Sequence, residues 1–384
     1  MFIEPRFVLL VVLCWTTFSV VPTRFRSHVL VAWSLAFYAL YAPQVIGLVL
    51  GFVLLTYLLA ERRHKWIVIA LVVGLLAYFK RPVGSAAAVG DALDVQIGSP
   101  LVPLGFSYLA LELIHYAVER SRGRIRQATL TDLAAFALFF PCRVAGPIKR
   151  YTDFTASVAE ARPSSRETYR GCFRILSGLF KKVVLADALR RAAGAVAVAT
   201  TPAQAWQAMV AYSLWLFLDF SAYSDFAVGV SRLMGIRVPE NFNWPYLSTN
   251  IQEFWNRWHM SLSSWARDYV FTGVGRQLFR TRVKSRPGVI AATSYFATFL
   301  VIGAWHGLAL NFLVWGAYHG LLVTAYHFYK RSLPVRVAAS PFYRSRVVSW
   351  GGSALTFVLV TIGWVFFSMD VPSAFRVLQL MLVS

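Results

Sequence analysis

The chain of 384 residues is both very apolar and basic: 58% of its residues are hydrophobic, 14% are charged, and its formal net charge is +21. Soluble domains carry roughly a quarter charged residues, so the composition excludes an ordinary soluble protein and indicates a multi-pass protein of the lipid bilayer. The basic residues stand in short clusters between apolar runs rather than along one amphipathic stripe. We therefore assign these clusters to cytoplasmic loops and do not expect nucleic acid as a partner.

Seven uncharged runs define the helices expected along the chain. They cover residues 7–21, 29–41, 45–60, 66–79, 206–217, 289–304 and 355–367. A helix that spans a bilayer needs about 20 apolar residues, so the shorter runs predict short, tilted or re-entrant helices next to protein or a water-filled cavity. The first run is expected to be a retained helix rather than a cleaved signal peptide. The loop at 83–100 contains two aspartates and no lysine or arginine, which predicts an external loop.

No long internal repeat or Pro/Ser-rich linker divides the chain, so we expect a single domain over residues 1–384. Cys14, Cys142 and Cys172 are isolated and lack metal-ligand or redox spacing. Neither a metal site nor a disulfide is therefore expected.

The segment "NIQEFWNRWHMSLSSWARDYV" at residues 250–270 is unusually polar for this chain. If it forms one continuous helix, steps of four, three, four and four residues bring a polar stripe onto one face. That stripe consists of Gln252, Asn256, His259, Ser263 and Arg267. Two interpretations remain open at this point: an interfacial helix with its polar side in water, or the wall of a wet cavity inside a helix bundle.

His306 follows directly on an apolar run and stands between Gly303 and Gly307. A buried histidine tends to be neutral, and a neutral imidazole can accept a proton from a hydroxyl or a thiol. His306 is therefore a candidate general base, although a lone buried histidine is more often a structural hydrogen-bonding group. His319 lies thirteen residues on and would face another direction if the helix were continuous, so we expect it to be structural.

Two further segments carry polar residues inside apolar runs. In "FPCRVAGPIKRYTDF" at 140–154, two prolines and a glycine predict a broken, re-entrant segment. In "LFLDFSAYSDF" at 216–226, Asp219 and Asp225 are candidates either for proton handling or for a structural role at a helix break.

These blocks together resemble the membrane-bound O-acyltransferase (MBOAT) family. The resemblance rests on the 140–154 block, on "LDFSAYSDFAVGVSRLMGIRVPENFNWPYLSTNIQEFWNRWHMSLSSWARDYVF" and on "GAWHGLALNFLVWGAYHG", in that order and spacing. It divides the chain into N-terminal helices at 1–98, a signature core at 99–330 and C-terminal helices at 331–384. Within the family, "PENFN" and "FWNRWHMSLS" are most similar to the DltB branch of D-alanyl transfer proteins, and the alginate O-acetyltransferase (AlgI-like) branch is next.

The resemblance implies an all-α membrane protein with about eleven helices in a ring or bowl around a central tunnel. His306 matches the family's invariant histidine, and His259 matches its second conserved polar position. These two residues are the expected catalytic pair, and no metal is required. The weaker candidates for the substrate tunnel are Asn256, Ser263, Arg267, Trp305, Asp219 and Asp225.

The function implied by this branch is transfer of an acyl group, D-alanyl first, from the phosphopantetheine thioester of a small acidic carrier protein in the cytoplasm. The acceptor would be a hydroxyl of a cell-envelope glycopolymer or partner protein, reached with a membrane-anchored DltD-like or SGNH-type esterase outside. The expected location is the bacterial cytoplasmic (inner) membrane. One alternative is O-acetylation of exopolysaccharide or peptidoglycan with acetyl-CoA as donor. Another, from a different class, is a proton-coupled transporter.

Overall fold

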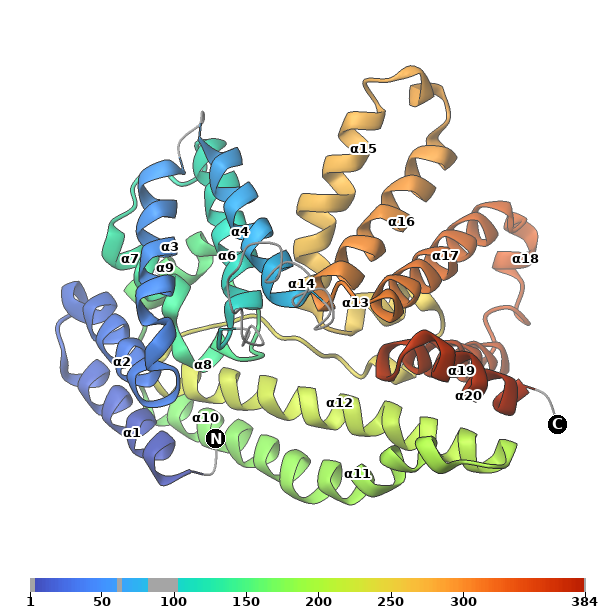
Figure 1. Ribbon diagram of the computed structural model, residues 1–384, viewed down its shortest axis with the longest axis horizontal. Helices are drawn as coiled ribbons and strands as arrows, with labels where there is room; N and C mark the ends of the chain where they lie inside the picture. The colour runs from blue at the N-terminus through green and yellow to red at the C-terminus, as the bar shows by residue number, and fades with distance from the viewer. Residues whose placement is uncertain (1–3, 61–63, 82–102, 383–384) are drawn as a thin grey trace, which may run out of the picture. The chain divides into compact units, whose positions relative to one another are not determined.

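The computed structural model describes residues 4–60, 64–81 and 103–382, and within these ranges it contains helices and loops but no strand. The all-α class predicted from the composition is confirmed for this part of the chain (Figure 1). The loop predicted to be external at 83–100 lies outside the described residues. The number of membrane helices and the central tunnel stay predictions.

The chain forms two compact units, which we describe separately. Unit 1 comprises Met1–Lys181 and Phe220–Glu240, and unit 2 comprises Lys182–Asp219 and Asn241–Ser384. The long helix α12 (Pro202–Leu233) contributes residues to both units. The expectation of a single domain stays a prediction.

Two described helices are long and apolar enough to cross a bilayer, and both belong to unit 2. They are α16 (Pro287–His306) and α19 (Arg346–Ser368). Three shorter apolar helical stretches span Pro5–Val20, Pro43–Leu59 and Val371–Leu382. The runs at 7–21, 29–41, 45–60 and 66–79 therefore appear as short helices of 14 to 16 residues, whereas the run at 206–217 lies inside the 32-residue helix α12.

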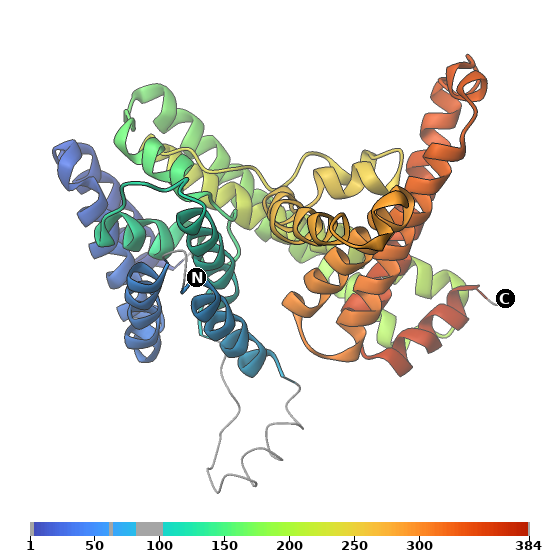
Figure 2. The same cartoon turned by 90° about the horizontal axis from the view of Figure 1, so that it is seen from above.

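Unit 1 is built from short helices that pack in neighbouring pairs. They are α1 (Pro5–Val20), α2 (Arg26–Tyr41), α3 (Ile46–Leu59), α4 (Lys65–Lys80), α6 (Phe106–Ser121), α7 (Leu130–Leu138), α8 (Phe140–Arg143), α9 (Tyr151–Ala159) and α10 (Ser165–Phe180). Helices α4 and α6 contact each other and lie side by side in both views (Figures 1 and 2). The break expected in the 140–154 block is present, since α8 is a single turn that follows the non-helical Phe139 and is followed by turn and coil at 144–150.

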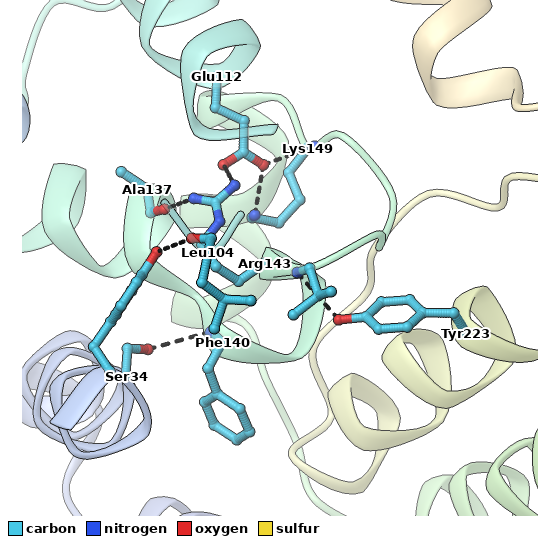
Figure 3. A network of polar contacts seen from close by, with 10 residues as sticks. Ser34, Leu104, Glu112, Ala137, Phe140, Arg143, Lys149 and Tyr223 are labelled. Atoms are coloured by element: carbon cyan, nitrogen blue, oxygen red, sulfur yellow. Dashed lines mark hydrogen bonds and ion pairs between the residues drawn. The ribbon is translucent and has the colours of Figure 1, made fainter. Parts of the chain in front are cut away.

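A buried charge cluster holds this broken segment in unit 1 (Figure 3). The carboxylate of Glu112 on α6 accepts hydrogen bonds from Arg143 Nη2 at 3.0 Å and from Lys149 Nζ at 2.6 Å. Arg143 Nη1 also donates to the carbonyl of Ala137 at the end of α7. All three charged side chains are at most 1% exposed. One carboxylate thus compensates two cations that water does not reach.

Neutral side chains satisfy the main-chain groups that the same break leaves without helical partners. The Phe140 N–H donates to Ser34 Oγ at 3.3 Å, and the Val144 N–H donates to the Tyr223 hydroxyl at 3.2 Å. The Tyr223 hydroxyl in turn donates to the Pro141 carbonyl at 3.3 Å. Irregular backbone inside a membrane protein is tolerated only when protein or water supplies such partners, so these contacts explain how a non-helical segment can persist here.

Unit 2 contains the unusually polar segment at 250–270 together with one helix before it and the helices after it. They are α11 (Asp187–Gly194), α13 (Ile251–Arg257), α14 (Met260–Ala266), α15 (Thr272–Leu278), α16, α17 (Leu310–Ser332), α18 (Val335–Ala339), α19 and α20 (Val371–Leu382). A π-helical turn, Arg267–Phe271, joins α14 to α15. Helices α16 and α17 form a closely packed hairpin (Figure 1).

Glycines set the separation of α16 and α17. A Cβ atom added to Gly303 would lie 2.4 Å from the Phe312 carbonyl oxygen, and one added to Gly316 would lie 2.5 Å from the Phe299 carbonyl oxygen. Both distances are shorter than any real carbon–oxygen packing contact, so only glycine allows the two backbones to approach this closely. Small residues serve the same purpose in many membrane helix pairs.

We predict that Glu112→Gln lowers the free energy of unfolding by about 3–5 kcal/mol, because it leaves two buried cations without a compensating charge. The control is Glu119→Gln. Glu119 pairs with Arg122 and Arg124, whose side chains are 33% and 67% exposed, so its loss should cost about 1 kcal/mol or less. Unfolding in mixed detergent micelles measures both variants. Equal losses in the two would show that the buried cluster does not stabilise unit 1.

We also predict that Gly316→Ala destabilises the α16–α17 hairpin by about 1–3 kcal/mol, because the added methyl group forces two backbones apart. Gly273→Ala in α15 is the matched control, since nothing in the described chain lies within 4 Å of its added Cβ. That control should be neutral or stabilising by up to about 1 kcal/mol, as alanine favours helix more than glycine does. Thermal unfolding in detergent tests the pair, and a Gly316→Ala protein as stable as Gly273→Ala would contradict the prediction.

Candidate functional site

His306 is the last residue of α16, and the helix ends there because Gly307 adopts an extended conformation. Its half-buried imidazole lies among aromatic rings of the hairpin and of α19. The ring centroid of His306 is 4.8 Å from that of Trp305, 5.4 Å from Trp315 and 4.9 Å from Phe367. The contact with Trp315 and the contact with Phe367 are both edge-on. The imidazole is therefore held in one orientation by packing.

His259 lies at a break between two helices rather than inside one. Helix α13 ends at Arg257 and α14 begins at Met260, so the continuous helix expected across the polar stripe is wrong at this point. The reason is the backbone of His259, whose φ of 42° is left-handed and cannot continue a right-handed helix. The side chain of His259 is nonetheless buried, with 2% of the residue exposed.

The two histidines that the sequence singles out meet at one indole. The ring of His259 is 6.2 Å from the ring of Trp305, and the ring of His306 is 4.8 Å from the same ring. Trp305 itself is buried, with 7% of the residue exposed. Two imidazoles separated by 47 residues of chain thus share a neighbour within unit 2, and their catalytic roles stay predictions.

A cavity of about 490 Å³ lies in unit 2; Met260, next to His259 in the chain, lines it, but neither His259, His306 nor Trp305 does. Its wall comes from α13, α14, the π-helical turn, α16 and α17, and includes Ile302, one helical turn before His306. Of the predicted polar stripe, the cavity is lined by Gln252, Asn256, Ser263 and Arg267. The opposite face of the segment is packed in protein: Phe254, Trp258, Leu262 and Trp265 are all buried.

The cavity has a mixed lining. Aromatic and aliphatic side chains, among them Trp255, Phe271 and Phe299, alternate with amides, hydroxyls and the guanidinium of Arg267. Arg267 is exposed, and its nearest ion-pair partner is the neighbouring Asp268 at 3.7 Å. Such a lining suits a flexible ligand with apolar and hydrogen-bonding parts. The residues also remain accessible, because Asn256 is exposed and Ser263 is half-buried.

His319 has a different environment from the other two histidines. It is fully buried on α17, and its ring lies 5.1 Å from Trp255 and 5.1 Å from Trp315. Neither of its ring nitrogens has a hydrogen-bond partner among the residues that the structure describes. Because α16 and α17 are separate helices, His306 and His319 reach the same indole of Trp315 from the two helices of the hairpin. His319 therefore belongs to the packing around the site.

Asp219 and Asp225 are ion-paired, and neither is among the residues that line the cavity. Asp219 pairs with Lys182 in unit 2, whereas Asp225 pairs with Arg174 at 2.7 Å and Lys181 at 2.7 Å in unit 1. These pairs fit a structural role. Within the described ranges, no three His, Cys, Asp or Glu side chains come together as a metal-binding group.

Sequence reasoning missed the residues that hold the His259 break in place. The Met260 N–H donates to the Asn241 carbonyl at 2.9 Å, and the Asn243 N–H donates to the Arg257 carbonyl at 3.0 Å. Ser261 Oγ donates to Asn241 Oδ1 at 2.6 Å. Both asparagines lie in "PENFN", which composition marks only as a polar linker. No local pattern indicates that this linker pairs with a segment about twenty residues away.

Comparison with known proteins identifies the family of the chain. The profile of the membrane-bound O-acyltransferase family matches residues 6–369. The chain is 33% identical over 378 residues to a probable alginate O-acetylase of Azotobacter vinelandii, covering 91% of this chain and 71% of that protein. It is 38% identical over 240 residues to the teichoic acid D-alanyltransferase of Bacillus subtilis, covering 59% of this chain and 60% of that protein.

A third relative is the peptidoglycan O-acetyltransferase of Helicobacter pylori, which is 28% identical over 395 residues and covers 91% of this chain and 72% of that protein. Both branches expected from the sequence thus occur among the relatives. The family profile spans nearly the whole chain and includes both histidines of the site. The chain is a member of the membrane-bound O-acyltransferase family and an acyltransferase.

Proposed function

We propose that this protein transfers an acyl group from a thioester to a hydroxyl of a cell-envelope polymer, in the bacterial cytoplasmic membrane. The observation that carries the proposal is the placement of His259 and His306 against the single indole of Trp305, in a member of an acyltransferase family. The neighbouring cavity supports it, because a reaction of this kind needs room for a donor arm beside the catalytic groups.

In the proposed reaction, His306 accepts the proton of the acceptor hydroxyl while the hydroxyl oxygen attacks the thioester carbonyl. The new carbon–oxygen bond replaces the carbon–sulfur bond, and the proton passes from His306 to the departing thiolate. The position of His306 at the C-terminal end of α16 supports this role, since helix carbonyls there stabilise the positive charge that forms on the ring. His259 would orient the acceptor or polarise the thioester carbonyl.

For the donor, we propose the phosphopantetheine thioester of a small acidic carrier protein that presents a D-alanyl group from the cytoplasmic side. The 38% identity to a D-alanyltransferase over 240 residues favours this donor, as does the net charge of +21, which would attract an acidic partner. An extracytoplasmic, membrane-anchored esterase of the DltD or SGNH type would complete delivery to the acceptor.

A second candidate is O-acetylation of an exopolysaccharide or of peptidoglycan, with acetyl-CoA as the donor. The observation that favours it is the extent of the match: acetylating relatives align with about nine-tenths of this chain, whereas the D-alanyltransferase aligns with 59%. Both candidates use the same site chemistry and differ in the acyl group and the acceptor.

We predict that His306→Ala lowers transfer by about 10²–10⁴, because general-base catalysis contributes on that order. The measurement is the rate at which label from the donor appears as alkali-labile ester in the polymer fraction of membranes. His64→Ala, an exposed histidine before α4, is the matched control and should transfer at the wild-type rate. A His306→Ala protein that folds and transfers normally would refute the proposed catalytic role.

The donor is identified with wild-type membranes supplied separately with labelled D-alanyl carrier protein and labelled acetyl-CoA. We expect label from the D-alanyl carrier to enter the envelope polymer and to be absent with His306→Ala membranes. Label from acetyl-CoA alone would replace the first candidate by the second. If neither donor yields polymer-bound label above the His306→Ala background, both proposals are wrong.

A further inference from the structure

The left-handed turn at His259 is a place where the chain adopts a conformation that a histidine rarely takes. Only one other residue in the described ranges that is not a glycine has a positive φ, namely Trp244 at 46°. Such a conformation persists only when surrounding contacts determine it, and residues held in this way concentrate at functional sites. The contacts that hold His259 are therefore part of how the site works.

Those contacts come from one short non-helical stretch, residues 241–243, which we call the brace. The brace bonds on both sides of His259: it donates to the carbonyl of Arg257 before the turn at 3.0 Å and accepts from the N–H of Met260 after it at 2.9 Å. The two helix ends that meet at His259 leave main-chain groups without helical partners, and the brace supplies two of these partners. A right-handed continuation through His259 would break both bonds.

Asn241 makes one of these two main-chain bonds and a further bond through its side chain. Its carbonyl accepts from the Met260 N–H, and its side-chain Oδ1 accepts from Ser261 Oγ at 2.6 Å. Asn241 is fully buried and Ser261 is 4% exposed, so water does not compete for either bond. The side-chain bond fixes where the first turn of α14 lies, and that turn begins directly after His259.

Packing holds the residue before the turn as well. Trp258 is buried, and its ring lies 5.1 Å from Phe242 of the brace and 5.0 Å from Trp364 of α19. Main-chain bonds, a side-chain bond and this indole thus restrain the backbone immediately on either side of His259. The imidazole of His259 lies in buried surroundings, with its ring centroid 6.2 Å from that of Trp305.

We propose that Asn241 is a positioning residue for the acyl transfer reaction: through Ser261 and the Met260 N–H, it holds the turn that presents the His259 imidazole to the Trp305–His306 pair. This inference rests on the proposed function. Displacing a catalytic group by about 1 Å can cost about 100-fold in rate, so losing the side-chain bond should reduce turnover far more than it reduces folding.

The test compares Asn241→Ala and Ser261→Ala, which remove the two ends of one hydrogen bond, with Ser213→Ala. Ser213 is also fully buried in unit 2, its hydroxyl lies 3.1 Å from that of Thr361, and it is not among the residues that line the cavity. We expect kcat for labelled-donor transfer to fall about 10–100-fold in the first two variants, with KM for the donor nearly unchanged. Ser213→Ala should keep the wild-type kcat at a similar loss of thermal stability.

Ser261→Thr keeps the hydroxyl and should recover most of the activity that Ser261→Ala loses. Wild-type kcat in both alanine variants would overturn the inference. An equal fall in kcat in all three alanine variants, in proportion to the loss of folded protein, would also overturn the inference. Wild-type protein that transfers no acyl group from either donor would instead refute the proposed function.

A measurement of the turn itself does not depend on activity. Diethyl pyrocarbonate modifies accessible neutral imidazoles, and mass spectrometry locates the modified histidines. In the wild type, buried His259 should react slowly and exposed His64 rapidly. We expect His259 to react several-fold faster in Asn241→Ala and Ser261→Ala, with His64 unchanged and with no such increase in Ser213→Ala. An unchanged rate at His259 would show that Asn241 does not hold the turn.

Discussion

The geometry of the site depends on how closely α16 and α17 approach each other. Gly303 and Gly316 allow the two backbones to lie in direct contact. A Cβ atom at either position would prevent this close approach. At this separation His306, at the end of α16, contacts the indole of Trp315 in the second turn of α17, and His319 contacts the same indole. A wider hairpin would remove the ring that orients His306. The position of the candidate base therefore follows from two residues without side chains.

Both histidines of the site stand where a helix stops, and this has a physical reason. Inside a helix a side chain is confined to the direction that its position dictates, and its backbone groups bond only within the helix. At a break the side chain can turn toward another segment, but main-chain groups lose their partners. Near His259, the brace supplies the missing partners: its carbonyl and its N–H form two of the hydrogen bonds that the helices cannot form there.

Periodicity and composition predict the parts of this site that depend on local sequence. The two faces of the 250–270 segment follow from a period of 3.6 residues, and the break in the 140–154 block follows from its prolines and glycine. The break at His259 does not, because nothing in "NRWHMSL" marks a left-handed residue. The break depends on the contact between Ser261 and Asn241, which lie 20 residues apart in the chain. The ion pair of Arg143 also has a distant partner, Glu112, 31 residues earlier. Such long-range pairing is a property of the fold rather than of any window of sequence.

The two breaks in the chain are held by different chemistry, and the difference suits their roles. The break near Arg143 in unit 1 is stabilised by a buried carboxylate and two cations. The break at His259 in unit 2 is held by carbonyls, amide N–H groups and a hydroxyl. In the proposed acyl transfer, His306 becomes positive and the attacked carbonyl oxygen becomes negative while His259 orients or polarises the substrate. A fixed charge in the support of His259 would favour one of these developing charges over the other, whereas neutral groups favour neither.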